Sequence, residues 1–156
     1  MKKFKWQPYV IFILFTEAVG ALAGILTQNS MEAYEALTKP PLTPPSIVFP
    51  IVWGVLFLLM GIGAARIYLS DKPGRKRALV IFGIQLAVNF FWSLLFFNLQ
   101  ALGFSFILLN GLWILIILMI VSFWKVDRLA ALLQIPYLLW VTFAGYLNLA
   151  IWLLNK

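Results

Sequence analysis

A few polar side chains interrupt the long apolar stretches of this sequence, and they are the residues that could do chemistry. Glu17 is the only acid well inside such a stretch, and the amides Gln85, Asn89 and Asn148 lie inside two others. Amides and indole rings bind flat ligands through hydrogen bonds at a polar edge and contact with the aromatic face. These residue types therefore favour the binding of a small molecule.

Aromatic residues accompany the amides at spacings of three and four, which places each set on one face of a helix. Because buried amides must find hydrogen-bond partners inside a membrane, we expect Gln85, Asn89 and Asn148 to point inward. Hydrogen bonds and packing between helices would explain the same pattern without a ligand. The alternative is an aromatic cavity between the second and fifth apolar stretches, where the small Ala144 leaves room for a flat ligand. The three sets are Trp53, Phe57 and Met60; Gln85, Asn89 and Trp92; and Tyr137, Trp140, Ala144 and Asn148.

The sequence lacks the usual machinery of a conventional enzyme. It contains no histidine base, no cysteine nucleophile, no paired acids within an apolar stretch and no glycine-rich phosphate loop. The missing histidine and cysteine also remove the best ligands for zinc, for an iron–sulfur cluster and for haem iron. We therefore expect no metal and no cofactor, and a small-molecule binding protein is the default hypothesis.

The elements that position these residues are predicted to be membrane helices. Hydrophobic residues make up 63% of the 156 residues and charged residues only 11%. Typical globular proteins have about 45–50% and 25%, so the charges are too few to cover a soluble surface. The absence of cysteine excludes a secreted disulfide scaffold, and the aromatic content of 17% excludes low-complexity disorder.

Five apolar runs are each long enough to cross a bilayer, which requires about 20 residues per helix. They are too long for the strands of a membrane β-barrel, which need about 10 residues each. The sequence thus predicts an all-α integral membrane protein, a five-transmembrane-helix bundle that forms a single domain over residues 1–156. The expected spans are residues 8–27, 47–69, 79–99, 103–124 and 129–154.

Basic residues are distributed unequally over the connecting segments. With five spans, ten of them fall on the side of the N-terminus, whereas Lys39 and Lys156 fall on the other. The positive-inside rule then predicts a cytoplasmic N-terminus and an external C-terminus. This topology accounts for the net charge of +7, so we expect no nucleic-acid partner. The ten are Lys2, Lys3, Lys5, Arg66, Lys72, Arg75, Lys76, Arg77, Lys125 and Arg128.

The first apolar run admits more than one interpretation. A basic start, an apolar stretch and an Ala-Leu-Ala motif resemble a signal peptide, but the run contains Glu17 and continues to Leu26, so we favour a retained helix. Glu17 shares one face with Gly20 and Gly24, and the two glycines form a GxxxG pattern that allows close helix approach. Glu17 has three possible roles: a structural hydrogen bond to a neighbouring helix, a proton relay and a ligand contact.

The segment between the first two spans, residues 28–46, is the longest connection and is rich in proline. Proline fixes the backbone and lacks an N–H, so the proline-rich part cannot be helical and should be stiff. A rigid linker would explain this composition. A lid over a cavity at the outer face is the alternative, because long loops are often functional. The prolines are Pro40, Pro41, Pro44 and Pro45.

Several separate motifs occur in order along nearly the whole chain. They are Lys39-Pro40-Pro41-Leu42-Thr43-Pro44-Pro45, Phe49-Pro50-Ile51-Val52-Trp53-Gly54, Met60-Gly61, Gln85-Leu86-Ala87-Val88-Asn89-Phe90-Phe91-Trp92 with Phe96-Phe97, and Pro136-Tyr137-Leu138-Leu139-Trp140 with Leu147-Asn148. With these motifs the sequence resembles the translocator protein family, also called TspO, tryptophan-rich sensory protein or peripheral benzodiazepine receptor.

The resemblance implies a five-helix bundle in a membrane, most simply a bacterial cell membrane, usually as a homodimer, with a ligand cavity closed by the first loop. It implies binding of porphyrins such as protoporphyrin IX and of benzodiazepine-type or isoquinoline ligands, with cholesterol for animal members. Bacterial relatives are linked to tetrapyrrole and stress regulation, and light-dependent porphyrin breakdown has been proposed for the family. Trp53 and Trp140 would take part in such photochemistry. The ligand-binding positions that carry over are Tyr34, Pro44, Trp53, Phe57, Asn89, Trp92, Trp140, Ala144 and Asn148.

The sequence also departs from the family pattern. Leu42 and Ile47 stand where many relatives have loop tryptophans, and Leu108 replaces an acid common early in the fourth helix. The cholesterol pattern of animal members needs a basic residue soon after a tyrosine, but Tyr146 has none before Lys156. The loop differences predict altered lid contacts, and the missing pattern lowers the expectation of sterol binding.

Three functions follow from the sequence and the resemblance. The first is a membrane receptor for porphyrin-like ligands, with free-base porphyrin favoured over haem because no His or Cys is available as axial ligand. The second is a carrier of lipid, sterol or tetrapyrrole, whose cavity opens sideways between helices to the membrane lipid. The third is an interaction scaffold with a collapsed cavity and no ligand.

Overall fold

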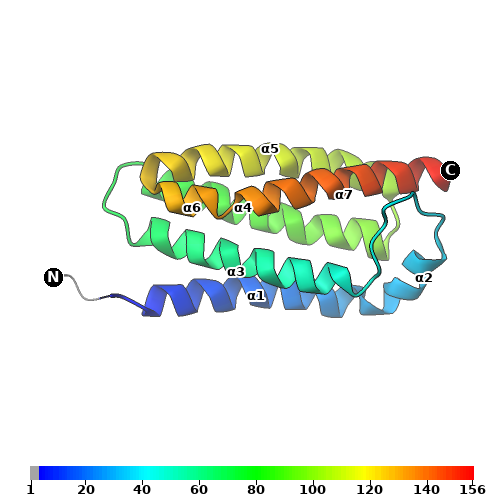
Figure 1. The fold of residues 1–156 in the computed structure, drawn as a ribbon, viewed down its shortest axis with the longest axis horizontal. Coiled ribbons are helices and arrows are strands. Elements are labelled where there is room, and N and C mark those ends of the chain that lie inside the picture. Colours follow the sequence, from blue (N-terminus) through cyan, green and yellow to red (C-terminus); the bar gives the residue numbers. More distant parts are fainter. Residues whose placement is uncertain (1–3) are drawn as a thin grey trace.

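The computed structural model describes residues 4–156, and every regular element within them is helical (Figure 1). In that part of the chain, five helical stretches are long and apolar enough to cross a membrane, which confirms the predicted all-α membrane bundle. Lys2 and Lys3, which entered the prediction of topology, lie outside the described residues. The stretches are Gln7–Ala36, Val48–Tyr68, Arg75–Asn98, Leu102–Val126 and Arg128–Leu154.

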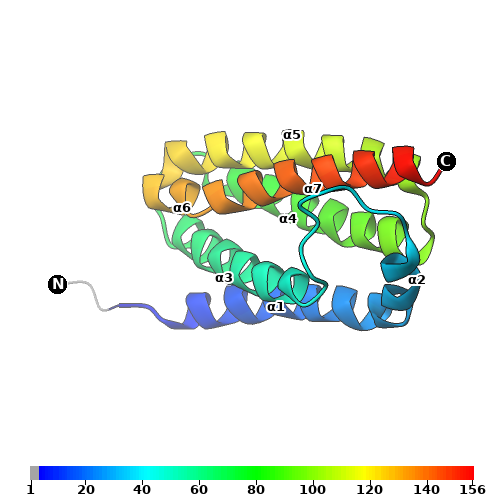
Figure 2. The same ribbon diagram turned by 45° about the vertical axis from the view of Figure 1, so that its right-hand side comes forward.

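The long helices run side by side along the long axis of the molecule (Figures 1 and 2). α1 packs along α3, whereas α5 packs against α4, α6 and α7. A 3-10 turn at Gln28–Ser30 follows α1, and a π-helical turn at Leu94–Asn98 follows α4. The α-helices are α1 (Gln7–Thr27), α2 (Met31–Ala36), α3 (Val48–Tyr68), α4 (Arg75–Ser93), α5 (Leu102–Val126), α6 (Arg128–Leu132) and α7 (Ile135–Leu154).

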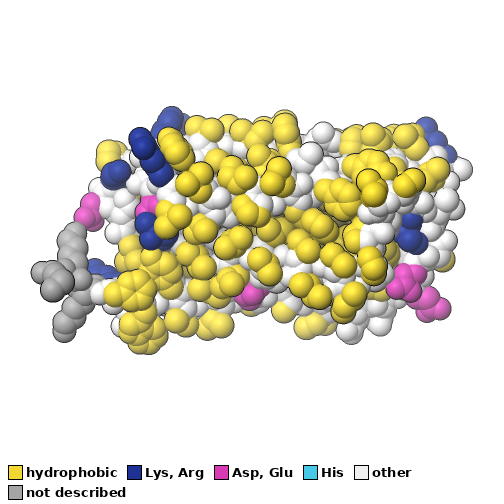
Figure 3. All heavy atoms as spheres, in the orientation of Figure 1, with side chains coloured by type: hydrophobic (Ala, Val, Ile, Leu, Met, Phe, Trp, Pro, Cys, Tyr) yellow, Lys and Arg dark blue, Asp and Glu magenta, His cyan; other side chains and the backbone are white. Residues whose placement is uncertain are grey.

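Large hydrophobic side chains cover the outside of the bundle, as Figure 3 shows for one face, while Lys and Arg side chains gather towards the two ends of the long axis. Phe15, Ile107 and Leu139 are each more than half exposed. The inside is also apolar, with Met60 and Leu112 fully buried. An apolar outer surface on helices that satisfy their own backbone hydrogen bonds is suited to lipid.

The third span begins earlier than its apolar run predicts. α4 starts at Arg75 because Gly74, with a left-handed backbone (φ +91°), turns the preceding loop into the helix. The basic residues 75–77 therefore form the first turn of a helix and not part of a loop. Hydropathy locates the apolar part of a helix, whereas its end depends on backbone conformation.

The third span ends in the π-helical turn, which is joined to the end of α1. The side-chain amide of Asn98 donates to the carbonyl of Leu26 (2.9 Å), and its Oδ1 accepts from the hydroxyl of Ser30 (2.6 Å). These bonds hold the loop ends of α1 and α4 together. Such π-helical turns often occur beside functional sites.

The fifth span was expected as one helix over 129–154, but it is broken between α6 and α7. Pro136 has no N–H to bond to the carbonyl one turn earlier, so the helical ladder is interrupted. Gln134 lies at the break and is fully buried. Its Nε2 donates to the carbonyls of Leu59 (3.2 Å) and Ala130 (3.3 Å), which ties the break to α3.

The first loop begins with helical turns and then runs extended to α3, fastened to the end of α7 (Figure 2). Lys39 Nζ donates to the carbonyl of Glu35 in the last turn of α2 (2.7 Å) and to that of Leu37, which follows the helix (3.0 Å). Thr38 and Asn155 exchange two hydrogen bonds of 3.0 and 2.8 Å. The Tyr146 hydroxyl donates to the carbonyl of Pro41 (2.9 Å). The stiff loop thus covers one end of the bundle.

Candidate functional site

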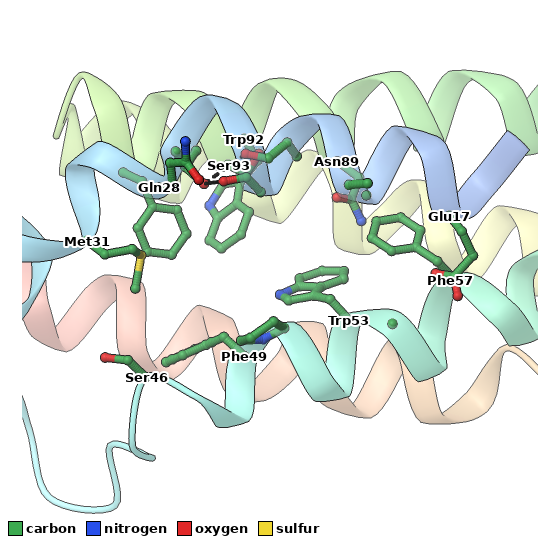
Figure 4. Close-up of a pocket in the computed structure, with 18 of the residues that line it drawn as sticks. Glu17, Gln28, Met31, Ser46, Phe49, Trp53, Phe57, Asn89, Trp92 and Ser93 are labelled. Atoms are coloured by element: carbon green, nitrogen blue, oxygen red, sulfur yellow. Dashed lines mark hydrogen bonds between the residues drawn. The ribbon is translucent and has the colours of Figure 1, made fainter. Parts of the chain in front are cut away.

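A cavity of about 720 Å³ lies between α1, α3 and α4 (Figure 4). Its aromatic walls are Phe49, Trp53 and Phe57 from α3, Trp92 from α4 and Phe97 from the π-helical turn. Sites for drug-sized ligands have about this volume, roughly 300–1,000 Å³. An open interior of this size argues against a scaffold whose cavity is collapsed.

Each of the two indole rings in the cavity wall is held by a neighbouring ring. Trp53 stacks on Phe57 with ring centroids 5.6 Å apart, and Trp92 stacks on Phe96 at 5.4 Å. The two indoles are 6.4 Å apart between centroids and inclined at 40°. Figure 4 shows them coming from opposite sides of the cavity. The walls are therefore broad, apolar and fixed in orientation.

The cavity exists because α1 and α3 pack closely over only part of their length. A Cβ added at Gly61 would lie 2.6 Å from the Cα of Ile13, and one at Gly20 would lie 2.5 Å from the ring of Phe57. Towards the loop, Gly24 lines the cavity, and a Cβ there would meet nothing within 4 Å. Glycines thus allow close contact at one end of the helix pair and leave open space at the other.

The predicted inward direction of the amides is confirmed, since Gln85, Asn89 and Asn148 are all buried. Asn89 Nδ2 donates to the hydroxyl of Tyr137 (2.7 Å), and this hydroxyl donates to Gln85 Oε1 (2.7 Å). Of the three amides, Asn89 alone lines the cavity. The bond to Tyr137 uses one N–H of the Asn89 amide, and the carbonyl oxygen of Asn89, which accepts no hydrogen bond from the described residues, is available to a ligand.

Asn148 has a structural role in this arrangement. Its Oδ1 accepts from the indole N–H of Trp92 (3.1 Å) and from the hydroxyl of Ser105 (3.1 Å). Its Nδ2 donates to the carbonyl of Leu102 (2.9 Å). Asn148 therefore holds Trp92, which does line the cavity, from behind.

Four of the nine ligand-binding positions implied by the resemblance line the cavity, and five do not. Trp53, Phe57, Asn89 and Trp92 lie in its wall. The other five, which are not in its wall, are Tyr34, Pro44, Trp140, Ala144 and Asn148.

Aromatic side chains are in contact in the space where a cavity between the second and fifth spans was expected. Tyr137 of α7 lies 6.2 Å from Trp53 between ring centroids, and Trp140 lies 5.9 Å from Phe49. Ala144 is buried in the core against this layer. The open space lies on the other side of α3, against α1.

Two polar atoms behind Phe49 are buried without a hydrogen-bond partner among residues 4–156. They are the hydroxyl of Tyr34 and the indole Nε1 of Trp140. The ring of Phe49, which lines the cavity, lies 5.9 Å from each of these two rings between centroids. At the loop end of the cavity, the ring of Phe49 thus separates two hydrogen-bond donors from the open space.

Sequence reasoning missed the contribution of α1. Gly20, Gly24 and Thr27 line the cavity, as do Gln28 and Met31 beyond the helix. The GxxxG pattern of α1 could have indicated this wall of the cavity, but the same pattern is compatible with close helix contact and with open space. The four loop prolines do not line the cavity, whereas Ser46 and Ile47, which follow them and precede α3, do.

Glu17 also lines the cavity. Its carboxyl group forms no hydrogen bond or ion pair with any residue in the described part of the chain, so the structural bond to a neighbouring helix, one of its three possible roles, is not present there. Figure 4 places its carboxyl group beside Phe57, at the end of the cavity away from Met31 and Ser46.

Comparison with known proteins assigns the chain to a family. The model of the TspO/MBR family matches residues 12–153. The chain is 34% identical to Protein CrtK of Rhodobacter capsulatus over 149 residues, 94% of this chain and 92% of that protein. It is 40% identical to Tryptophan-rich protein TspO of Chlorobaculum tepidum over 124 residues, 78% of each chain. It is 34% identical to the Translocator protein of Bos taurus over 157 residues, 97% of this chain and 92% of that protein. The protein with this five-helix bundle and tryptophan-walled cavity therefore belongs to the TspO/MBR family.

Proposed function

We propose that this protein is a membrane receptor for flat aromatic ligands of the porphyrin type, bound between α1, α3 and α4. The observation that carries the proposal is the pair of indole rings, Trp53 and Trp92, across a cavity of about 720 Å³. Rings fixed in this way offer large apolar contact to a planar macrocycle. Benzodiazepine-type and isoquinoline ligands, which are also flat, would use the same walls. A free-base porphyrin is favoured over haem, because the chain has no histidine or cysteine for the iron.

The unpartnered donors behind Phe49 support a place for the acidic edge of a porphyrin. A buried donor without a partner costs free energy. If the ring of Phe49 turns aside, the Tyr34 hydroxyl and the Trp140 indole N–H could donate to a propionate of the ligand. The propionates would then lie at the loop end of the cavity.

The test is a titration with protoporphyrin IX in detergent, followed by the ligand's own visible absorbance. Trp53→Leu should weaken binding about tenfold, the change expected when a stacked ring worth about 1.4 kcal/mol is lost. Trp124→Leu is the matched control, because Trp124 is exposed and lies outside the cavity lining. Equal affinity of both variants and the unaltered protein would exclude this cavity as the porphyrin site.

The proposal extends to light-dependent oxidative breakdown of the bound porphyrin, with the ligand as photosensitiser and dissolved dioxygen as the oxidant. Trp53 lies in the wall and would react first, whereas Trp140 lies behind Phe49. Illumination of the saturated complex should bleach the porphyrin band more slowly in Trp53→Phe than in Trp140→Phe. If the porphyrin bleaches at the rate of free porphyrin in the unaltered protein and in both variants, the protein binds the ligand but does not promote its breakdown. Such a receptor could serve tetrapyrrole or stress regulation.

A carrier for lipid, sterol or tetrapyrrole is the second candidate, favoured by the side opening of the cavity. Ala21 and Gly24 of α1, Ile47 and Pro50 line the cavity and are also exposed on the outer surface. A ligand could enter from the lipid between α1 and α3. Release of protoporphyrin IX from loaded vesicles, faster with the protein than without it, would support the carrier over the receptor.

We also propose that the N-terminus is cytoplasmic and the C-terminus external in a bacterial cell membrane. Most of the described basic residues lie at one end, within the α3–α4 and α5–α6 connections or in the helical turns beside them, and this supports the positive-inside assignment. Cysteines introduced in place of Glu32 and Lys72 should react with an impermeant reagent from opposite sides of the membrane. Labelling of Lys72→Cys from outside would reverse the topology.

A further inference from the structure

Glu17 is a carboxyl group in the wall of the cavity, near the middle of α1. Ionised carboxylates are costly at membrane depth and normally have a partner there. None of the described residues that line the cavity is basic. Arg66, the basic residue of α3, is bound instead to Asp127 (3.0 Å) at the far end of that helix. Nothing in the described chain therefore neutralises Glu17.

Two side chains near this end of the cavity already donate hydrogen bonds within the protein. Thr16, the neighbour of Glu17, donates its hydroxyl to the carbonyl of Phe57 (2.7 Å). Asn89 donates one N–H of its amide to Tyr137 (2.7 Å), and its carbonyl oxygen accepts no hydrogen bond from the described residues. In Figure 4, the nitrogen of the Trp53 ring is directed away from Glu17, towards Phe49.

The cavity thus has two chemically different ends. The end near Glu17 and Asn89 offers oxygen acceptors, whereas the loop end has Gln28 and Ser46 in its wall and the unpartnered donors of Tyr34 and Trp140 behind it. Apolar rings separate the two ends. An elongated or disc-shaped aromatic ligand in this space would meet acceptors at one edge and donors at the other.

We propose that the Glu17 end is a subsite for a protonated amine or another N–H donor carried on a flat aromatic body. This inference rests on the proposed function of the cavity as a site for flat ligands. The carboxylate attracts a cationic group and repels an acid, most strongly where apolar walls exclude water. Ligands that carry both groups therefore bind in one orientation, with their acids at the loop end.

The experiment uses three pyrene probes of similar size: 1-pyrenemethylamine, 1-methylpyrene and 1-pyrenecarboxylate. Binding is followed by energy transfer from tryptophan to pyrene, in uncharged detergent at neutral pH, where the alkylamine is protonated. Competition with protoporphyrin IX shows whether the probes occupy the proposed porphyrin site. Because the amount of probe dissolved in detergent is the same for every variant, affinity ratios are compared between variants.

Glu17→Gln keeps the shape of the side chain and removes its charge, and Glu32→Gln removes the same charge from an exposed position on α2. In the unaltered protein and in Glu32→Gln, the amine should bind about tenfold more tightly than methylpyrene, and the carboxylate more weakly. In Glu17→Gln the amine-to-methylpyrene ratio should fall to nearly one, while methylpyrene binds as before. Retained methylpyrene binding also shows that the variant is folded.

Two results would overturn this inference while the porphyrin site stands. The first is that Glu17→Gln binds the amine over methylpyrene as strongly as the unaltered protein does. The second is that the unaltered protein shows no preference for the amine, although methylpyrene binds and is displaced by protoporphyrin IX. Either result would mean that the Glu17 carboxyl group interacts with lipid or with a second copy of the chain and not with the ligand. Absence of binding by methylpyrene and protoporphyrin IX would instead contradict the proposed function itself.

Discussion

The hydroxyl group of Tyr137 joins two buried amides of α4 to α7. It accepts a hydrogen bond from Asn89 and donates one to Gln85, both at 2.7 Å, and the side chain is 1% exposed. Asn89 belongs to the cavity wall, whereas Gln85 lies in the core and has a second contact with the sulfur of Met60 (3.9 Å). A single hydroxyl therefore sets which face Asn89 presents to a ligand.

Tyr137→Phe should lower the free energy of unfolding by about 1–2 kcal/mol, because two buried amides lose their partner. Measured bonds between membrane helices average only about 0.6 kcal/mol, so the lower part of this range is expected. Unfolding in mixed micelles measures the change. Tyr146→Phe is the control, since its hydroxyl bond to Pro41 is exposed. An equal loss in both variants would contradict a special role for the buried hydroxyl.

At the scale of helices, the close approach of α1 and α3 depends on Gly61. Its added Cβ would lie 2.6 Å from the Cα and 2.8 Å from the backbone nitrogen of Ile13, so no side-chain rotation relieves the contact. Gly61→Ala should therefore separate the two helices and destabilise the fold by about 1–3 kcal/mol. Gly111→Ala on α5 is the control, because a Cβ there meets nothing within 4 Å. It should be neutral or gain up to about 1 kcal/mol from helix propensity. Unfolding in mixed micelles measures both changes. Equal stability of the two variants would contradict a tight contact between Gly61 and Ile13.

The corner between α5 and α6 is tied to α3 by an ion pair. Asp127 bonds to Arg66 at 3.0 and 3.2 Å, and it also caps α6 by accepting from the N–H of Ala130 (3.0 Å). Burial alone would raise the pKa of Asp127, but these hydrogen bonds and the charge of Arg66 outweigh it and hold the pKa below its ordinary value. A carboxyl group with a lowered pKa in the folded state stabilises the fold above its unfolded pKa.

Asp127→Asn keeps an oxygen for the cap and removes the charge. At pH 6 it should cost under about 1 kcal/mol, because the pair is partly exposed to solvent. The cost should disappear as the pH falls below about 4, the ordinary pKa of the group, and through the lower folded value. Unfolding of both proteins between pH 6 and pH 3 measures this. A difference that does not shrink in acid would rule out the ion pair as its source.

At the scale of the whole molecule, the structure distinguishes two candidate faces for a homodimer. Gly20 is covered by Phe57 within the same chain and Gly24 lines the cavity, so both glycines of the α1 GxxxG pair are directed towards α3 and the cavity. Gly83 and Ala87 of α4 are both exposed. Small exposed residues allow a second helix to approach closely in lipid.

We predict a homodimer through the Gly83 and Ala87 face of α4. Gly83→Leu should lower the crosslinked dimer fraction without loss of the fold, because the larger side chain keeps the two helices apart. Gly111→Leu on α5 is the matched control, since Gly111 is also exposed and a Cβ there meets nothing within 4 Å. An undiminished dimer in Gly83→Leu would place the contact on another face.

The sequence by itself determined the class of the molecule, the number of its spans and the inward direction of its amides. Hydropathy and helical spacing are local properties, and a membrane admits few backbone structures, so these features could be predicted without knowledge of packing. Trp53, Phe57, Asn89 and Trp92 could also be named as a site, from their spacing and from the resemblance to the family.

Only the tertiary structure decided which side of α3 is open. The stripes on the second and fifth spans are equally compatible with a cavity and with a filled core, and Tyr137 and Trp140 fill the space between them. The open space arises instead where α1 leaves α3 beyond Gly20. Whether a glycine closes a contact or borders a void depends on the residue opposite it, and that residue is distant in the sequence. For the same reason, the lack of a partner for Glu17 could be recognised only once every neighbouring element was in place.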